Sequence, residues 1–492
     1  MVSLIVFLLL FIVFSYLGLK GKDFRAGNLD LLHEWALGGQ RFGAWLLWFL
    51  IGADLFTAYT FIAVPSGLFA KGPIFFFAVP YVAMGFGVAL AVMPKFFAVS
   101  KEKCHITAVD FIKDRYNSKS LAIMVALVGI TAELPYIALQ IVGMKVVLST
   151  LLMQFKGINQ NLVNEISLSL AFLILSWFTY KSGLRGATLT AVLKDFLILG
   201  TVLVLSVYIP LHYHGFYQAF EIKRAYATLN PKLISAYISL SVMSSLALFL
   251  YPHAITGCLS SSDVKVLKKS IAFLPIYGIG LAILALFGVL VYEVKPTMDM
   301  LNHIPASARG SFVVPALIVS TMPQWFSGIA LLGIFIGGLV PASIMAIASS
   351  NLMVNILREL NIASPSNETK LAKWFSFLFK LIPLLFVFLV PPTFAIALQL
   401  IGGIIILQTL PSIFLGLFVK HLNKESLMIG LIAGIVFGIY ELEKVNHFGI
   451  IQNVLMPSSF GLIFIGLPAL AINLFVVLIG SFYQYIFRKN AQ

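Results

Sequence analysis

The sequence has few charged residues and almost no cysteine. Asp, Glu, Lys and Arg make up only 11% of its 492 residues, whereas about a quarter of the residues in a soluble globular protein are charged. Cys104 and Cys258 are the only cysteines, so a disulfide framework is excluded. The sequence also lacks a Walker-type phosphate loop, a metal-spaced Cys/His cluster and a nucleophile elbow. These absences argue against ATP-driven pumping and hydrolysis.

Long hydrophobic runs dominate the chain instead. Hydrophobic residues make up 60% of it, and the mean hydropathy is +0.99. Runs of about 20 apolar residues recur, which is the length of a transmembrane helix and unlike the pattern of a barrel. The sequence therefore predicts an all-α membrane protein with 13 transmembrane helices. We interpret the first as a retained span, because it lacks a basic start and a cleavage site. The spans are expected near residues 2–19, 43–70, 73–97, 120–153, 163–181, 187–210, 234–258, 271–293, 325–357, 374–391, 395–419, 427–441 and 461–486.

The basic residues predict how the chain is oriented. Of the 33 Lys and Arg residues, 23 fall on one side of the expected spans and eight on the other. Basic loops stay in the cytoplasm, so we expect a cell-membrane protein with its N-terminus outside and its C-terminus inside. This rule accounts for the net charge of +14 without a nucleic-acid partner. The count assigns Lys181, Arg185 and Lys194 to the inner side.

Two of the expected spans are interrupted. The stretch "FLIGADLFTAYTFIAVPSG" (49–67) contains Pro65 and Gly67, and "SLALFLYPHAITG" (245–257) contains Pro252. The interruptions fall in the second and seventh spans, five spans apart, which predicts inverted repeats with a binding site at their interface. The chain would then consist of a first helix and loop (1–42), a first repeat (43–210), a second repeat (234–420) and C-terminal helices (426–492).

A break in a membrane helix has direct chemical consequences. Proline removes a backbone donor and frees a carbonyl one turn earlier, and such groups are costly in hydrocarbon unless they are satisfied. Cations satisfy carbonyls, and anions satisfy the amides at a half-helix N-terminus. The breaks therefore predict a site for a solute and an ion. The alternative is a packing kink held by a neighbouring helix.

Two acids lie in apolar surroundings, and an ionised side chain at membrane depth is usually functional. Asp54 belongs to the first break, and Glu133 lies in "ITAELPYIALQ" of the fourth span. Glu133, Tyr136 and Gln140 share one helical face, which predicts that they face a cavity. Structural salt bridges or protonated acids are the alternative interpretation.

The remaining polar residues within the spans leave several roles open. His253 could carry a proton, donate to a carboxylate substrate, or bond a carbonyl freed by Pro252. Asp195 follows Lys194 directly, and we expect a local ion pair there. Ser343 and Ser350 of the ninth span share one face and are candidate ligands for an alkali cation, unless this face only packs small residues.

Several motifs resemble the sodium:solute symporter family. "EWALGGQRFGAW" resembles the start of its first broken helix, "SGLRGATLTAVLKD" the loop before its sixth span and "TAVDFIKDRY" the cytoplasmic loop after its third. "GADLFTAYTFIAVP", "PYIALQIVGM", "ALFLYPHAITG" and "LQLIGGIIILQTLP" resemble the branch of bacterial monocarboxylate permeases. The resemblance implies a leucine-transporter-type 5+5 inverted-repeat core. It also implies cation-coupled uptake of a small monocarboxylate such as lactate, pyruvate or acetate.

The resemblance also implies a cation site. Sodium would lie between the carbonyls of Ala53 and Phe56 and hydroxyls of the ninth span. The usual hydroxyl pair falls here on Ala346 and Ile347, which have none, and Ser343 lies one turn earlier. Glu133, an acid expected within a membrane span, is a rival proton site, so Na+ and H+ both stand as coupling ions.

These inferences predict a symporter with no cofactor besides its coupling ion. An amino acid or other neutral or zwitterionic solute is the alternative substrate. A membrane enzyme is disfavoured because the acids are scattered singly. The residues expected around the substrate are Asp54, Thr57, Tyr59, Tyr136, Gln140, Tyr251 and His253.

Overall fold

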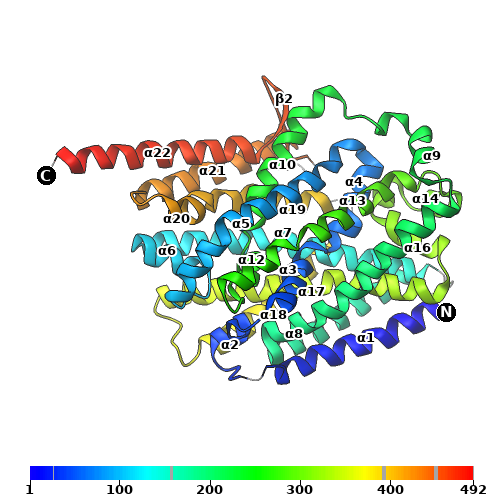
Figure 1. The fold of residues 1–492 in the computed structure, drawn as a ribbon, viewed down its shortest axis with the longest axis horizontal. Helices are drawn as coiled ribbons and strands as arrows, with labels where there is room; N and C mark the ends of the chain where they lie inside the picture. Colours follow the sequence, from blue (N-terminus) through cyan, green and yellow to red (C-terminus); the bar gives the residue numbers. More distant parts are fainter. Residues whose placement is uncertain (26, 154, 156–158, 390–394, 448–452, 491–492) are drawn as a thin grey trace.

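The computed structural model describes residues 1–492 except 26, 154, 156–158, 390–394, 448–452 and 491–492. The described part is an all-α bundle whose two termini lie at opposite ends (Figure 1). Its helices are α1 (Val2–Lys20), α2 (Leu32–Leu37), α3 (Ala44–Leu55), α4 (Val64–Lys71), α5 (Ala78–Glu102), α6 (Ala108–Tyr116), α7 (Lys119–Leu152), α8 (Gln160–His212), α9 (Gly215–Ile222), α10 (Ile234–Leu248), α11 (Pro252–Leu259), α12 (Val264–Ala272), α13 (Pro275–Leu290), α14 (Lys295–Asn302), α15 (Ala306–Arg309), α16 (Val313–Thr321), α17 (Gln324–Glu359), α18 (Glu368–Leu389), α19 (Ala395–Ile406), α20 (Gly416–Phe418), α21 (Lys424–Val445) and α22 (Gly466–Asn490).

Within the described residues, 11 helices are long and apolar enough to cross a membrane, or 12 with one bent pair counted as a span. α8 is counted as one of these helices, although its 53 residues include Gly183, whose backbone is non-helical at φ 56° and ψ −144°. An uninterrupted helix of that length would measure about 80 Å, far more than the bilayer core of about 30 Å. Gly183 therefore divides α8 into two arms, but the exact number of 13 spans stays a prediction. The expected boundary between spans 374–391 and 395–419 lies outside the described residues.

The expectation that the last span starts at residue 461 is wrong. Residues Leu455–Ser458 (β1) and Gly461–Phe464 (β2) form an antiparallel hairpin, with Leu455 opposite Phe464, and α22 begins at Gly466. Gly461 supplies the turn with a φ of +98°, a conformation that glycine adopts readily. A short apolar run can form a strand or a helix, so hydropathy alone places this boundary too early.

The two expected interruptions are confirmed. The axis bends by 45° between α3 and the segment Tyr59–Lys71, which starts as the π-helix η3 (Tyr59–Ala63). The second break separates α10 from α11 at residues 249–251. Both breaks lie beside α7, and α7 packs against α17. Among the described residues, α17 is the most buried of the helices long enough to span a membrane. The interruptions therefore lie in the interior of the bundle.

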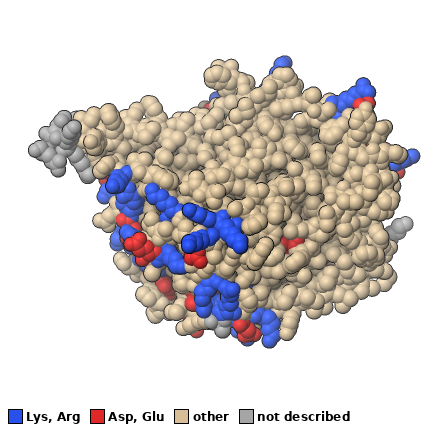
Figure 2. Space-filling view, in the orientation of Figure 1, with Lys and Arg blue, Asp and Glu red and all other residues tan. Residues whose placement is uncertain are grey.

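Charged side chains concentrate at one end of the visible face. Figure 2 shows Lys and Arg, with several acids among them, at the end away from the N-terminus, over the region of α6 and α12 in Figure 1. Arg185 and Lys194, both counted on the inner side, are fully buried in α8. Arg185 pairs with Glu34 and Lys194 with Asp195, which makes burial of these cations tolerable.

Candidate functional site

The first break satisfies part of its backbone with its own side chains. α3 ends at Leu55, and Thr60 Oγ1 donates to the Leu55 carbonyl at 2.7 Å. Thr57 Oγ1 accepts the N–H of Tyr59 at 3.1 Å, as an N-cap residue does. Thr57, predicted as a substrate contact, therefore already holds the start of the second half-helix.

Gln140 of α7 closes the same break from outside. Its Oε1 accepts the N–H of Ala58 at 3.0 Å, and its Nε2 lies 3.4 Å from the Tyr136 carbonyl. α7 comes this close because it has glycine at 143, where a Cβ would lie 2.4 Å from the Ala58 Cβ. Gln140 is buried beside the predicted site, and both of these contacts are to the backbone.

The freed carbonyls of Ala53 and Phe56 already face a cation. Lys194 Nζ from the second arm of α8 donates to Ala53 O at 3.2 Å and to Phe56 O at 3.0 Å. The same nitrogen lies 2.8 Å from Asp195 Oδ1, so the local ion pair expected from the sequence is confirmed. Tyr277 of α13 donates to the other oxygen of Asp195 at 2.7 Å.

The structure thus reveals a role for Lys194 that its place beside Asp195 did not predict. The signal in the sequence was a lysine within a predicted span, which normally marks a paired or functional side chain. Its partners Ala53 and Phe56 lie 141 and 138 residues earlier in the chain. No local pattern connects such distant positions.

The predicted ninth-span ligands lie farther along α17. A Cβ at Gly337 would be 3.8 Å from Phe56 O, so Gly337 marks where α17 passes the first break. Ser343, Ala346 and Ile347 are fully buried and follow it by six to ten residues, about 9–15 Å along a helix. The Ser343 hydroxyl lies 2.8 Å from the Thr179 hydroxyl of the first arm of α8.

At the second break, Glu133 of α7 contacts His253 of α11. Pro252 opens α11, where a proline is tolerated because the first amides have no helical partner. The next residue, His253, places its backbone N–H 2.9 Å and its ring Nδ1 2.7 Å from Glu133 Oε1 of α7. Both side chains are buried. The other oxygen, Glu133 Oε2, has no hydrogen-bond partner among the described residues.

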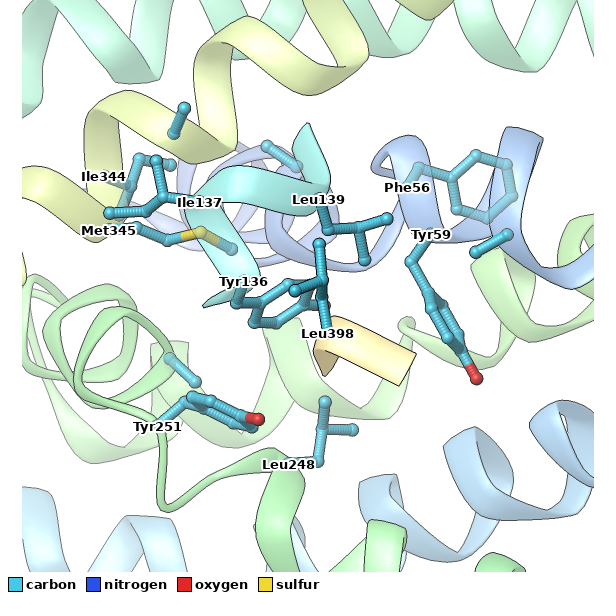
Figure 3. Packing of buried hydrophobic residues seen from close by; sticks show 14 of the residues in the cluster. Phe56, Tyr59, Tyr136, Ile137, Leu139, Leu248, Tyr251, Ile344, Met345 and Leu398 are labelled. Atoms are coloured by element: carbon cyan, nitrogen blue, oxygen red, sulfur yellow. The ribbon is translucent and has the colours of Figure 1, made fainter. Parts of the chain in front are cut away.

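Aromatic rings surround this pair. The ring of Tyr136 lies 5.3 Å from that of Tyr251 and 5.4 Å from that of His253 between centroids. Figure 3 shows Tyr136 and Tyr251 next to each other, with Leu398 close by and Tyr59 on the far side. The Tyr251 hydroxyl donates to the carbonyl of Gln399 at 3.1 Å. The buried Tyr59 hydroxyl has no partner among the described residues, which leaves it free to meet a ligand.

Glycines bring α19 to this region. A Cβ at Gly402 would lie 2.6 Å from the Ala132 carbonyl and 2.8 Å from the Tyr251 hydroxyl. Gly402 therefore allows a close approach between α19 and α7. It brings the helix that carries Leu398 and Gln399 against the aromatic wall.

Asp54 lies between the two breaks. It is only 4% exposed, and neither carboxylate oxygen has a hydrogen-bond partner within the described ranges. On the side of α11, a Cβ at Gly257 would lie 3.6 Å from Asp54 Oδ2. Asp54 also interacts electrostatically with His253, Glu133 and Lys194. A buried acid without partners is expensive, so this is the position where a ligand or a proton is most needed.

A multi-pass bundle with interrupted helices around buried acids defines a membrane transporter. The model of the sodium:solute symporter family matches residues 35–434. The chain belongs to this family, which confirms the resemblance seen in its motifs.

The relatives of the chain carry the names of transport proteins. It is 35% identical over 444 residues to a monocarboxylate transport permease protein of Rhizobium johnstonii, covering 88% of this chain and 87% of the relative. It is also 35% identical to the uncharacterized symporter YodF of Bacillus subtilis, covering 85% and 83% of the two chains. A solved structure of a Na+-coupled sialic acid symporter superposes with a TM-score of 0.72 over 98% of both chains, at 17% identity. That structure shares the fold.

Proposed function

We propose that this chain is a secondary active transporter that takes up a small monocarboxylate, such as lactate, pyruvate or acetate, together with a cation. It works by alternating access in the cell membrane, with the N-terminus outside and the C-terminus in the cytoplasm. Residues 43–210 and 234–420 form the two inverted repeats, and the substrate binds where their broken helices meet. The coupling cation is Na+ by family resemblance or H+ by the position of Glu133.

The observation that carries this proposal is the buried polar region between the two breaks. Asp54 and Tyr59 carry polar atoms that have no partner among the described residues, and Tyr136, Tyr251 and His253 are packed together beside them. An apolar surrounding with a few convergent polar groups is typical of a small-molecule site. The Tyr59 hydroxyl is a donor that suits a carboxylate.

The charges of this region support symport. Asp54, Glu133 and Asp195 are three acids, and Lys194 and His253 are their basic neighbours. A further carboxylate brought in by the substrate adds negative charge to a poorly solvated interior, which is costly unless a positive charge comes with it. A cation or proton that enters with the anion removes this cost. The 35% identity with a monocarboxylate permease supports the substrate class.

Uptake of labelled lactate into proteoliposomes tests the proposal. We expect accumulation above equilibrium when a Na+ or H+ gradient is imposed, and none in liposomes without protein. Unlabelled pyruvate and acetate should compete, and unlabelled alanine should not. Competition by alanine alone would favour the amino-acid alternative. Monodisperse protein that accumulates lactate under neither gradient would overturn the proposed function.

A further inference from the structure

We propose that the ammonium group of Lys194 is a built-in cation that takes the place of Na+ at the first helix break, so that this chain transports without Na+. The proposal deepens the proposed function and shares its transport assay, but its binding test is independent of any substrate. It departs from what the family name implies, because the donor set at the break does not fit a sodium ion.

Three oxygen atoms surround the ammonium group of Lys194. An ammonium group has three N–H bonds and no acceptor. Ala53 O and Phe56 O accept at 3.2 and 3.0 Å, and Asp195 Oδ1 lies 2.8 Å away. These are the two carbonyls that the family resemblance assigns to sodium. A second cation at these carbonyls would meet a like charge in a buried place, where repulsion is strong.

The side of the break that faces α17 offers few oxygen ligands for a sodium ion. Hard cations need a shell of several oxygen ligands. The positions of the usual hydroxyl pair are Ala346 and Ile347, and the Ser343 hydroxyl bonds Thr179. The part of α17 beside Phe56 O is Gly337, which contributes no side chain. The break itself would then supply two ligands, the carbonyls of Ala53 and Phe56.

The surroundings keep the charge of Lys194 compensated. Asp195 faces it from its own helix, Asp54 acts on it from α3, and Tyr277 of α13 holds the far oxygen of Asp195. Lys194 is fully buried, and its ammonium bridges α8 to the unwound segment of α3. A bound cation at this point would do the same, which is why the lysine can replace it.

Thermal unfolding of the purified protein in NaCl and in choline chloride tests this without substrate. A bound ligand raises the unfolding temperature, and an ion that does not bind leaves it unchanged. We expect the wild type to unfold at the same temperature in both salts. In Lys194→Ala, Na+ can enter beside Asp195, and we expect NaCl to raise the unfolding temperature by about 3 °C or more. Lys181→Ala, an exposed lysine on the same helix, should behave like the wild type.

A double variant protects the test against misfolding. Lys194→Ala leaves the Asp195 carboxylate buried without its partner, whereas Lys194→Ala/Asp195→Asn removes both charges. The double variant should fold and should lose the stabilisation by NaCl, because the anionic ligand is gone. A wild type stabilised by NaCl over choline chloride, or a folded Lys194→Ala that ignores Na+, would overturn the proposal. If neither variant folds, the wild-type comparison decides alone.

The lactate-uptake assay distinguishes failure of this proposal from failure of the proposed function. At a fixed proton gradient, wild-type lactate uptake should be equal in Na+ and choline media, and a requirement for Na+ would overturn the built-in cation. Failure to transport any monocarboxylate would refute the substrate class. The unfolding data would still decide whether Lys194 excludes Na+.

Discussion

One oxygen of Glu133 meets His253 twice, at 2.9 Å from its backbone N–H and at 2.7 Å from its ring Nδ1. The contact ties the middle of α7 to the first turn of α11, at the end of a half-helix that favours negative charge. Movement of α11 must therefore disturb Glu133, and a change in the charge of Glu133 must alter how α11 is held. The proposed proton coupling would act through this contact between Glu133, His253 and the broken helix.

Glu133→Gln should impair proton-driven accumulation while substrate binding and exchange persist. Glutamine keeps an oxygen that can accept the His253 N–H, but it cannot take up or release a proton. We expect accumulation under a pH gradient to fall at least tenfold, while exchange of labelled for unlabelled substrate persists. Glu133→Ala should instead lower stability by about 1–3 kcal/mol, because a buried donor loses its partner. Proton-driven accumulation equal to wild type in Glu133→Gln would refute the proton site.

Asp54→Asn should impair transport without harming the fold. Neither Asp54 oxygen has a hydrogen-bond partner in the described part of the chain, so the substitution removes a buried charge and breaks no hydrogen bond there. We expect an unfolding temperature equal to or above that of the wild type and at least a tenfold loss of uptake. Asp263→Asn, at an exposed helix cap, is the control that should retain uptake. A marked loss of stability in Asp54→Asn would show a structural role instead.

Gln140→Leu tests how the first break is held. Gln140 Oε1 accepts the hydrogen bond of the buried Ala58 N–H, and an unsatisfied amide costs about 1–3 kcal/mol. We expect a lower unfolding temperature and weaker substrate binding. Gln140→Glu retains an acceptor at the same place and should recover much of the stability. If Gln140→Leu is as stable as the wild type, the amide must find another partner.

Gly52→Ala tests the close approach of α13 to α3. A Cβ at Gly52 would lie 2.1 Å from Cζ of Tyr277, far inside contact distance, so the ring that holds Asp195 must move. We expect destabilisation of about 1–3 kcal/mol from overpacking and reduced uptake. Gly200→Ala on α8 meets nothing within 4 Å and should be neutral or stabilising, since alanine favours helix. Equal unfolding temperatures for the two variants would contradict this packing.

The sequence by itself determined that this is a membrane protein, where its two broken helices lie, and which acids stand within the spans. Lipid imposes these features locally: a span needs about 20 apolar residues, and proline interrupts its hydrogen bonds. An acid within a span needs a reason to be there. Asp54, Glu133 and the breaks beside Pro65 and Pro252 could therefore be found from the letters alone. The repeat boundaries and the orientation of the termini follow from the same rules and stay predictions.

Only the tertiary structure decided which groups satisfy one another. Lys194 lies within a predicted span beside Asp195, and its ammonium group also reaches the carbonyls of Ala53 and Phe56 across about 140 residues. His253 and Glu133, two separate candidates in the sequence, became one pair across 120 residues. Hydropathy also missed the hairpin at 455–464, because its apolar residues suit a strand as well as a helix. Partners are set by how helices pack, and packing joins positions whose separation no local period records.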